Sequence, residues 1–404
     1  MPTIRRIRLG HAPNCSSLGN VLNALVWTQV AVAALWVAAE AWPARRRRPE
    51  PGGGETRAVE DPPALVTVDE EAGASPHALA AGPIEAHVQV TRACGLPCPS
   101  CHIDPTADGA HVPIDALDTR FAGLAARGVF RVAIGGGEAL RHPDLPAIAA
   151  AAARHGLTIG LTTSGVGLSE RRAGELAGFA QVNVSLDGVG ATFAAARGYD
   201  GADGALKAIR ILAGVGAHVG VNVVLDRDTF DHLEETVLAA VAAGARDIQL
   251  LRLKPAGRAT AAYLDRRLTP AQGWDLWPRA RALVEAHPGV TFRVDCSLVP
   301  FLAAHGVDAE RMRAFAFLGC HGGDALVSVD PAGAEHPCSF VSGPVTPEWR
   351  AGVTRGPCAG CDYRDLCRGG CHAVAAHLTG DLFAPDPECP MVLAAGAGET
   401  GVGA

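Results

Sequence analysis

Six short apolar segments alternate with alanine-rich, amphipathic stretches between residues 85 and 290 of this 404-residue chain. Alternation of this kind builds a parallel sheet, because each helix returns the chain so that the next strand runs in the same direction. Helices are predicted at 115–127 and 229–243, among others, and strands at 86–90, 131–135, 158–163, 181–186, 218–225 and 247–253. The repetition stops near residue 290, which disfavours an ordinary eight-unit barrel.

Charge and cysteine content exclude several classes of protein. The chain has 42 acidic and 35 basic residues, a net charge of -7, and its basic run at 45–48 is short, so nothing in the sequence indicates a nucleic-acid partner. The 12 cysteines fall largely into groups spaced like metal ligands, in a chain too long for a small disulfide-stapled domain. We therefore expect a globular protein of the reducing cytoplasm.

The first cysteine group directly follows the first predicted strand and consists of Cys94, Cys98 and Cys101. A cubane 4Fe-4S cluster has four irons, so three thiolates leave one iron open to a small-molecule ligand. This C-x3-C-x2-C loop resembles that of the radical S-adenosylmethionine (SAM) superfamily, which holds its cluster after the first barrel strand. The resemblance implies an α/β fold with a partial (β/α)6 TIM-like barrel.

Further motifs of that superfamily follow in order at the carboxyl ends of later strands, where barrel active sites lie. Gly136-Gly137-Glu138 resembles the GGE motif, whose backbone contacts the methionine amino group of SAM, and we expect both glycines to let the backbone approach that ligand. Any one such strand end is more typical of a plain turn. The resemblance assigns further cofactor contacts to Thr163, Ser185, Asp187, Asn222 and Arg252, with Lys254 lining the same mouth.

One position departs from the superfamily pattern. Ser100 precedes the third cysteine of the loop, where the family usually has an aromatic residue that packs near the adenine. This departure leaves the adenine contact in doubt and does not affect the cluster.

The second cysteine group lies between residues 320 and 389. Its order resembles the SPASM domain, an extension of peptide-modifying radical SAM enzymes that carries two auxiliary 4Fe-4S clusters. Residues 327–333 predict a strand entering the tight turn of that domain's hairpin. The resemblance assigns the outer cluster to Cys358, Cys361, Cys367 and Cys389, and the inner cluster to Cys320, Cys338 and Cys371.

The inner set is one ligand short. Many SPASM proteins supply that ligand from a cysteine a few residues before the position of Cys320, and this chain has no cysteine at 314–316. Cys296 is the remaining candidate, and we predict that it folds back to complete the inner cluster. The alternative is that this iron is open to substrate. The alternative for the whole region is a pair of zinc sites, because C-x2-C pairs also build four-thiolate zinc ribbons.

The first part of the chain has a different composition. Residues 21–42 are apolar and close to the ~20 residues of a membrane helix, although three polar residues interrupt them. Cys15 precedes this run, and its position is typical of an ordinary thiol in a terminus, with docking or modification as the alternative. The predicted units are a membrane or partner contact at 1–43, a flexible linker at 44–84, the barrel at 85–290, the SPASM domain at 291–395 and a tail at 396–404.

The resemblance also implies a function. Radical SAM enzymes reductively cleave SAM to methionine and a 5'-deoxyadenosyl radical, which removes a hydrogen atom from a substrate carbon. Auxiliary clusters that accept the remaining electron favour a two-electron oxidation, such as a cross-link or a desaturation. SPASM enzymes mostly modify peptides or proteins, so we expect a ribosomally made precursor peptide as substrate. We further expect a separate peptide-recognition protein and an electron donor such as flavodoxin or ferredoxin.

Other functions use the same motifs. Sulfatase maturation is disfavoured, because those enzymes have an acidic residue after the cysteine that matches Cys338, and Ser339 stands there. Oxidation of a haem precursor or of another small molecule stays open on this scaffold. From a different class, the chain could be a non-catalytic iron-sulfur electron carrier or a zinc-stabilised binding module, and the intact GGE motif argues against both.

Overall fold

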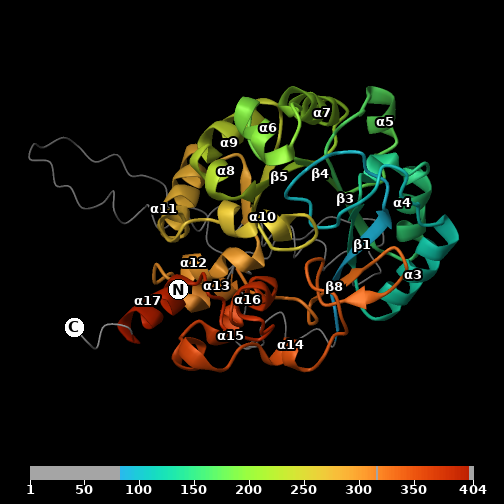
Figure 1. Cartoon of the computed structure of the whole chain (residues 1–404). Coiled ribbons are helices and arrows are strands. Elements are labelled where there is room, and N and C mark those ends of the chain that lie inside the picture. The colour runs from blue at the N-terminus through green and yellow to red at the C-terminus, as the bar shows by residue number, and fades with distance from the viewer. Residues whose placement is uncertain (1–81, 315–316, 400–404) are drawn as a thin grey trace, which may run out of the picture.

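The computed structural model describes residues 82–314 and 317–399, and these form one nine-stranded sheet flanked by helices (Figure 1). The spatial order is β7-β6-β5-β4-β3-β2-β1-β8-β9, and all neighbouring strands are parallel except the last pair. The strands are β1 (Glu85–Thr91), β2 (Arg131–Gly136), β3 (Thr158–Thr163), β4 (Gln181–Ser185), β5 (Val219–Leu225), β6 (Asp247–Arg252), β7 (Thr291–Val294), β8 (Leu326–Val329) and β9 (Glu335–His336).

The six predicted strands correspond to β1 to β6, so the predicted partial barrel is confirmed. The structure extends this parallel sheet on both sides, because β7 pairs with β6 and the predicted hairpin strand β8 pairs with β1. β7 was not predicted, since its four residues are too few for a clear alternation of apolar and polar positions. The sheet therefore includes strands from both sides of the predicted boundary at residue 290, and that boundary stays a prediction.

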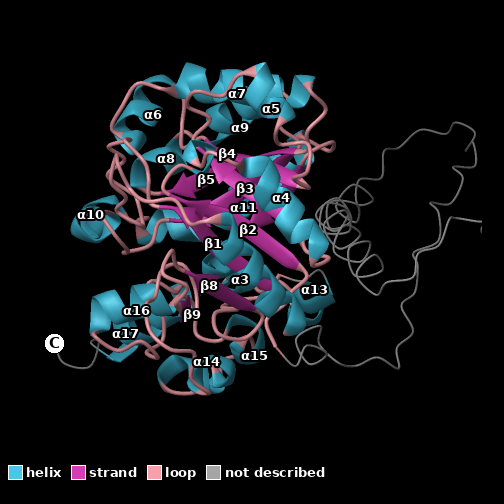
Figure 2. Ribbon diagram, turned by 90° about the vertical axis from the view of Figure 1, so that its right-hand side faces the viewer, coloured by secondary structure: helices cyan, strands magenta, loops and turns pink. Residues whose placement is uncertain are grey.

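Alternating side chains give the sheet two unlike faces. On β1, Ala86, Val88 and Val90 are at most 1% exposed and belong to the hydrophobic core that packs against the helices. The residues between them, including His87 and Gln89, are partly exposed on the opposite face. Figure 2 shows the strands enclosed by the helical layer, so this second face lines the inside of the barrel. The barrel interior is consequently polar.

Helices cover the outside of the sheet and connect consecutive strands. The predicted helix at 115–127 is observed, whereas the one at 229–243 is split, because the backbone at His232 (φ -108°, ψ 19°) leaves the helical range. The helices of this layer are α3 (Ile114–Ala126), η1 (Ala139–Arg141), α4 (Leu145–Arg154), α5 (Glu170–Gly174), α6 (Gly190–Arg197), α7 (Ala202–Gly214), α8 (Arg227–Asp231), α9 (Leu233–Ala242), α10 (Ala259–Arg266) and α11 (Pro270–Ala286).

The cysteine-rich region lies at the lower side of Figure 1 and begins beyond β7. The predicted hairpin is observed as β8 and β9, with Gly333 (φ +93°) in the turn. Arg120 of α3 holds this turn, since its guanidinium donates to the carbonyl oxygens of Asp330 (3.1 Å) and Pro331 (2.9 Å). The helices of the region are η2 (Cys296–Leu298), α12 (Val299–Ala303), α13 (Ala309–Ala314), α14 (Glu348–Ala351), η3 (Gly356–Gly360), α15 (Arg364–Cys367), α16 (His372–Thr379) and α17 (Pro390–Glu399).

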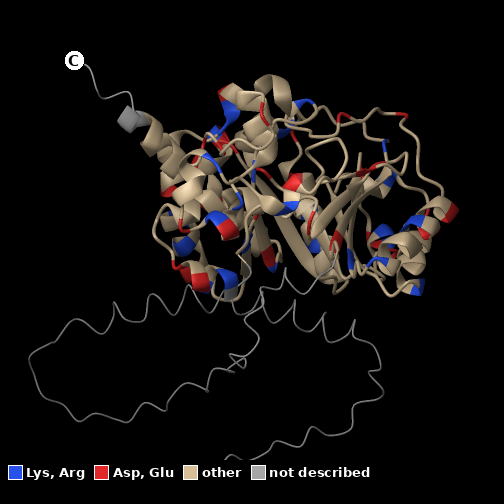
Figure 3. Cartoon of the chain, turned by 90° about the horizontal axis from the view of Figure 1, so that it is seen from below, with Lys and Arg blue, Asp and Glu red and all other residues tan. Residues whose placement is uncertain are grey.

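Two sequence predictions concern the surface and the first part of the chain. Basic and acidic residues of the described part are interspersed in the view of Figure 3. Among the described helices, no segment has the length and apolar character of a membrane span. The apolar run at 21–42 and Cys15 lie outside the described residues, so their predicted roles stay predictions.

Candidate functional site

The first cysteine group forms a loop at the carboxyl end of β1. The Cys94 N–H donates to the carbonyl oxygen of Thr106 (2.8 Å), and the carbonyl oxygen of Cys101 accepts from the Arg258 N–H (2.8 Å). Burial raises the pKa of the Cys94 thiol, and electrostatic interactions with Cys98 and Cys101 raise it further. The three predicted ligands are thus close together, and their binding of iron stays a prediction.

The Gly-Gly-Glu turn at the end of β2 packs directly on this loop. The Gly137 N–H donates to Thr91 and the Glu138 N–H to Ala93, each to the carbonyl oxygen at 2.8 Å. A Cβ at Gly136 would lie 2.2 Å from the Thr91 oxygen, and one at Gly137 would lie 2.5 Å from the Ala93 oxygen. Both glycines thus allow close backbone packing, Gly136 against the end of β1 and Gly137 against the start of the cysteine loop, and their predicted contact with SAM stays a prediction.

Glu138 connects the ends of β2 and β3. Its buried carboxylate accepts from the Leu140 N–H (3.0 Å), the Thr163 hydroxyl (2.6 Å), the Ser164 N–H (2.7 Å) and the Ser164 hydroxyl (2.5 Å). Hydrogen bonds to an ionised acceptor are about twice as strong as neutral ones. Glu138 and Thr163 therefore lie together at the barrel mouth, where the Thr163 hydroxyl is hydrogen-bonded to the Glu138 carboxylate.

The ends of β4 and β5 carry the next predicted contacts. Ser185 and Asn222 are partners in the strand register. Asp187 is 3% exposed, accepts from the Val224 N–H (2.7 Å) and forms an ion pair with Arg197 Nε (2.7 Å). Burial raises the pKa of Asp187, and the Arg197 charge opposes this shift.

Arg197 is a site residue that the sequence reasoning missed. It ends α6, and its guanidinium interacts electrostatically with the Cys98 thiol as well as with Asp187. The side chain thus connects the cysteine loop to the end of β4. A single arginine before a glycine resembles an ordinary helix end, so the sequence contains no signal that separates it from others.

Unpartnered polar atoms mark the barrel interior. Gln89 Oε1, Asn183 Oδ1 and Asn222 Oδ1 are buried, and none has a hydrogen-bond partner within the described part of the chain. A buried polar atom without a partner costs about 1–3 kcal/mol. These oxygens lie on the interior face of β1, β4 and β5, so they suit a polar ligand with N–H or O–H donors. The amino and hydroxyl groups of SAM are donors of this kind.

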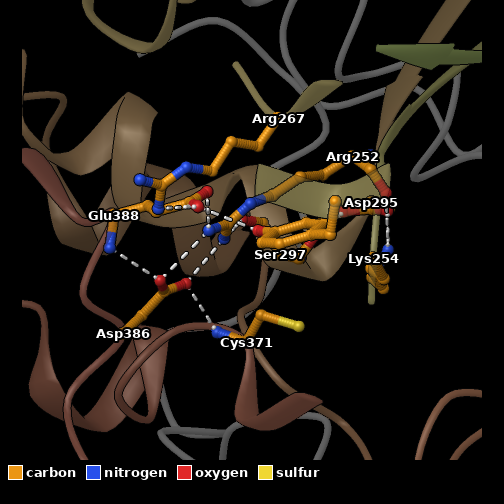
Figure 4. Close-up of polar contacts among 9 residues, drawn as sticks. Arg252, Lys254, Arg267, Asp295, Ser297, Cys371, Asp386 and Glu388 are labelled. Atoms are coloured by element: carbon orange, nitrogen blue, oxygen red, sulfur yellow. Dashed lines mark hydrogen bonds and ion pairs between the residues drawn. The ribbon is translucent and has the colours of Figure 1, made fainter. Parts of the chain in front are cut away.

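Arg252 and Lys254, at the end of β6, point to the C-terminal region. The Arg252 guanidinium donates to Asp386 and Glu388, and Lys254 Nζ lies 2.5 Å from Asp295 Oδ2 (Figure 4). Lys254 Nζ also lies 4.5 Å from the centroid of the Phe340 ring. Both cations are buried and already paired. The predicted contact between Arg252 and SAM stays a prediction, and the structure assigns its guanidinium other partners.

The C-terminal cysteines form two neighbourhoods. Electrostatic interactions join Cys320 to Cys296, Cys338 and Cys371, and join Cys296 to the latter two. A second set consists of Cys358, Cys361, Cys367 and Cys389. These are the two predicted sets, with Cys296 beside the inner one, and their ligand roles stay predictions.

Cys367, Cys371 and Cys389 are buried, and the other five C-terminal thiols are partly exposed. Burial raises the pKa of Cys296 to about 12 and that of Cys371 to about 11. Thiols with such raised pKa values stay protonated unless a metal stabilises the thiolate. No three described His, Cys, Asp or Glu side chains converge closely enough to hold a single metal ion, so each set is a neighbourhood of thiols and not a preformed single-ion site.

Sequence comparisons agree with the motifs. Residues 88–240 match the model of the radical SAM superfamily. The mycofactocin maturase MftC of Mycobacterium tuberculosis is 30% identical over 333 residues, which cover 74% of this chain and 81% of that relative. The PqqA peptide cyclase of Streptomyces rochei is 29% identical over 345 residues, which cover 75% of this chain and 88% of the relative.

Solved structures share the fold. Streptococcus suis SuiB bound to the precursor peptide SuiA superposes with a TM-score of 0.62 at 16% identity, covering 78% of this chain and 77% of that one. The enzyme anSMEcpe, with bound AdoMet and the Cp18Cys peptide, gives a TM-score of 0.57 at 14% identity, covering 78% and 95%. The chain belongs to the radical SAM superfamily, among its SPASM-domain peptide maturases.

Proposed function

We propose that the chain uses SAM and a 4Fe-4S cluster to oxidise a ribosomally made precursor peptide by two electrons, forming a cross-link or a desaturation. The observation that carries this proposal is the grouping of Cys94, Cys98 and Cys101 beside the Gly136–Glu138 turn at the barrel mouth. When bound, the cluster and SAM supply a radical that removes a hydrogen atom from the substrate. The peptide substrate agrees with the printed names of the relatives, a mycofactocin maturase and a PqqA peptide cyclase.

The protein's own residues have distinct tasks in this proposal. The three loop thiolates would hold three irons, and the polar interior with Asn222 and Gln89 would orient SAM and the peptide. Arg197 would place a positive charge beside Cys98, close to the cluster. The helices that enclose the barrel would keep water from the radical.

Two auxiliary 4Fe-4S clusters complete the proposal. Cys296, Cys320, Cys338 and Cys371 would hold the inner cluster, and Cys358, Cys361, Cys367 and Cys389 the outer one. A cluster that accepts the second substrate electron accounts for a two-electron oxidation, while the substrate releases the accompanying proton. Zinc in these sites would stabilise the fold without accepting an electron.

Other partners are part of the same proposal. A flavodoxin or ferredoxin would deliver the electron that starts each cleavage, and a separate recognition protein would present the peptide. The proposed location is the cytoplasm, because its reducing conditions keep cysteine thiols free to bind a cluster.

Sulfatase maturation is the second candidate, and one contact bears on it. Ser339, where those enzymes have an acidic residue, lies within hydrogen-bond distance of His87 Nδ1 on the interior face of β1 (Oγ to Nδ1, 3.0 Å). A neutral hydroxyl at this position lacks the negative charge of a carboxylate, so this contact disfavours sulfatase maturation.

A mass-spectrometric assay tests the proposal. The enzyme, reconstituted without oxygen, is incubated with SAM, dithionite and the peptides encoded beside its gene. We expect one peptide to lose two hydrogens, and the same peptide to stay unchanged with the Cys98→Ala variant. Loss of two hydrogens from a small molecule alone, or equal turnover by the Cys98→Ala variant, would contradict the peptide-maturase function.

A further inference from the structure

A buried arginine joins the end of β6 to the C-terminal region. Arg252 is 3% exposed, and its Nη1 and Nη2 donate to Asp386 Oδ2 (2.6 Å) and Oδ1 (3.1 Å). Its Nη2 also donates to Glu388 Oε2 (2.7 Å) (Figure 4). A bidentate guanidinium-carboxylate pair has a defined geometry as well as a strong attraction, so it fixes Asp386 relative to the barrel.

The charges of this network balance. Glu388 accepts from Arg267 Nη1 (3.0 Å) and from the Tyr263 hydroxyl (2.9 Å), so two arginines face two carboxylates. Removing one partner from a buried pair leaves an uncompensated charge, which is costly. The two guanidinium groups therefore compensate the two carboxylates without any contribution from the cysteines.

Asp386 contacts both C-terminal cysteine sets. The residue is 0% exposed, and its Oδ2 accepts from the N–H of Cys371, in the inner set, at 2.9 Å. Its backbone oxygen accepts from the N–H of Cys389, in the outer set, at 3.0 Å. A Cβ at Gly370 would lie 2.4 Å from the Asp386 Cβ, so the chain passes this carboxylate without room for a side chain.

The charge of Asp386 also reaches the sulfur atoms. It interacts electrostatically with the thiols of Cys358, Cys367, Cys371 and Cys389. Because the carboxylate is fully buried, water and salt screen these interactions little. The Glu388 carboxylate, in the same network, accepts from Arg252, Tyr263 and Arg267, and among the described residues it accepts from no cysteine, so it provides a matched comparison.

We propose that Asp386, oriented by Arg252, is a positioning residue shared by the two auxiliary clusters: it fixes Cys371 relative to Cys389, and its negative charge lowers the reduction potential of the outer cluster. This inference rests on the proposed function, which supplies the two clusters. A negative charge near a cluster disfavours the added electron of its reduced form. Asp386 accepts a hydrogen bond from the Cys389 N–H of the outer set, and its charge interacts with three outer thiols and one inner thiol, so we expect the larger effect at the outer cluster.

A redox titration tests this role apart from catalysis. The parent is the full chain with Cys94, Cys98 and Cys101 changed to alanine, so that only the C-terminal clusters give electron paramagnetic resonance signals. Asp386→Asn and Glu388→Gln are compared in this parent for iron content and midpoint potentials. We expect Asp386→Asn to change the ratio of reduced to oxidised outer cluster about tenfold at a fixed potential, a rise of 59 mV for one electron. Glu388→Gln is expected to change it less.

The possible results distinguish a failure of the role of Asp386 from a failure of the proposed auxiliary clusters. About eight irons in the parent, with unchanged potentials in Asp386→Asn, would overturn the role of Asp386 alone. A parent without iron would overturn the proposed auxiliary clusters and this inference with them. If Asp386→Asn fails to fold, the double variant Arg252→Gln/Asp386→Asn removes both buried charges together. The outer potential must then be higher in the double variant than in Arg252→Gln alone, and equal values in these two variants would refute the proposal.

Discussion

Gly137→Ala tests whether the glycines of the turn serve the cysteine loop. A Cβ at Gly137 would lie 2.5 Å from the Ala93 carbonyl oxygen, 2.7 Å from its carbonyl carbon and 3.0 Å from the Arg92 carbonyl carbon. All three atoms are backbone, so no side chain can rotate away. Gly137 is also not among the glycines with positive φ, so alanine adds contact without conformational strain.

The cost follows from the movement that the new methyl group requires. The turn and the loop must separate by several tenths of an ångström, and forced overpacking of this kind costs about 1–3 kcal/mol. Because the loop contains Cys94, the same movement displaces a predicted iron ligand. Gly135→Ala is the matched control, since a Cβ built there has no described atom within 4 Å apart from its chain neighbours.

The assay measures thermal unfolding of the iron-free protein and iron content after reconstitution of both variants. We expect Gly137→Ala to melt a few degrees below the wild type and to lose iron from the first cluster, while Gly135→Ala stays within about 0.5 kcal/mol of the wild type. Equal stability and equal iron content in the two variants would refute the reasoning.

Three further predictions address other parts of the site. Cys296→Ala should lose up to about four irons per chain and change the inner-cluster spectrum, whereas Cys15→Ala should lose none; unchanged iron in Cys296→Ala rejects its ligand role. Glu138→Gln should destabilise the iron-free protein by about 1–3 kcal/mol, because the carboxylate accepts four hydrogen bonds, and a loss no larger than that of exposed Glu170→Gln would count against this. Burial lowers the pKa of His87 below 6.5, so the unfolded chain binds this proton first and stability falls as the pH drops below 6.5. The melting temperature of His87→Gln should therefore depend less on pH in that range, and parallel curves for both proteins would disprove it.

Local spacing was sufficient to predict most of the fold and the groups of cysteines that the structure brings together, whereas their binding of iron stays a prediction. The strands β1 to β6 follow from alternation within five to seven residues, and the cysteine loop lies directly after the first of them. The antiparallel β8–β9 hairpin follows from the turn at Gly333. Such features depend on residues that are close in the sequence, so they can be predicted without knowledge of the fold.

Contacts between distant segments could not be predicted in this way. Arg252 and Asp386 are 134 residues apart, and only the folded chain shows that the arginine faces a carboxylate beside two cysteine sets. Arg197 likewise reaches Cys98 because the barrel brings the end of α6 to the cysteine loop. The packing of Gly136 and Gly137 against the backbone of residues 91–93 was likewise not predicted from the sequence, and their predicted contact with SAM stays a prediction.

The central claim is that the first cysteine group supports reductive cleavage of SAM. The most direct measurement is 5'-deoxyadenosine formed from SAM and dithionite by the anaerobically reconstituted enzyme, together with iron per chain. We predict about twelve irons and continued formation of 5'-deoxyadenosine by the wild type, and no product from a variant with Cys94, Cys98 and Cys101 changed to alanine. Zinc in place of iron, with no 5'-deoxyadenosine from the wild type, would contradict the account and indicate a structural metal protein.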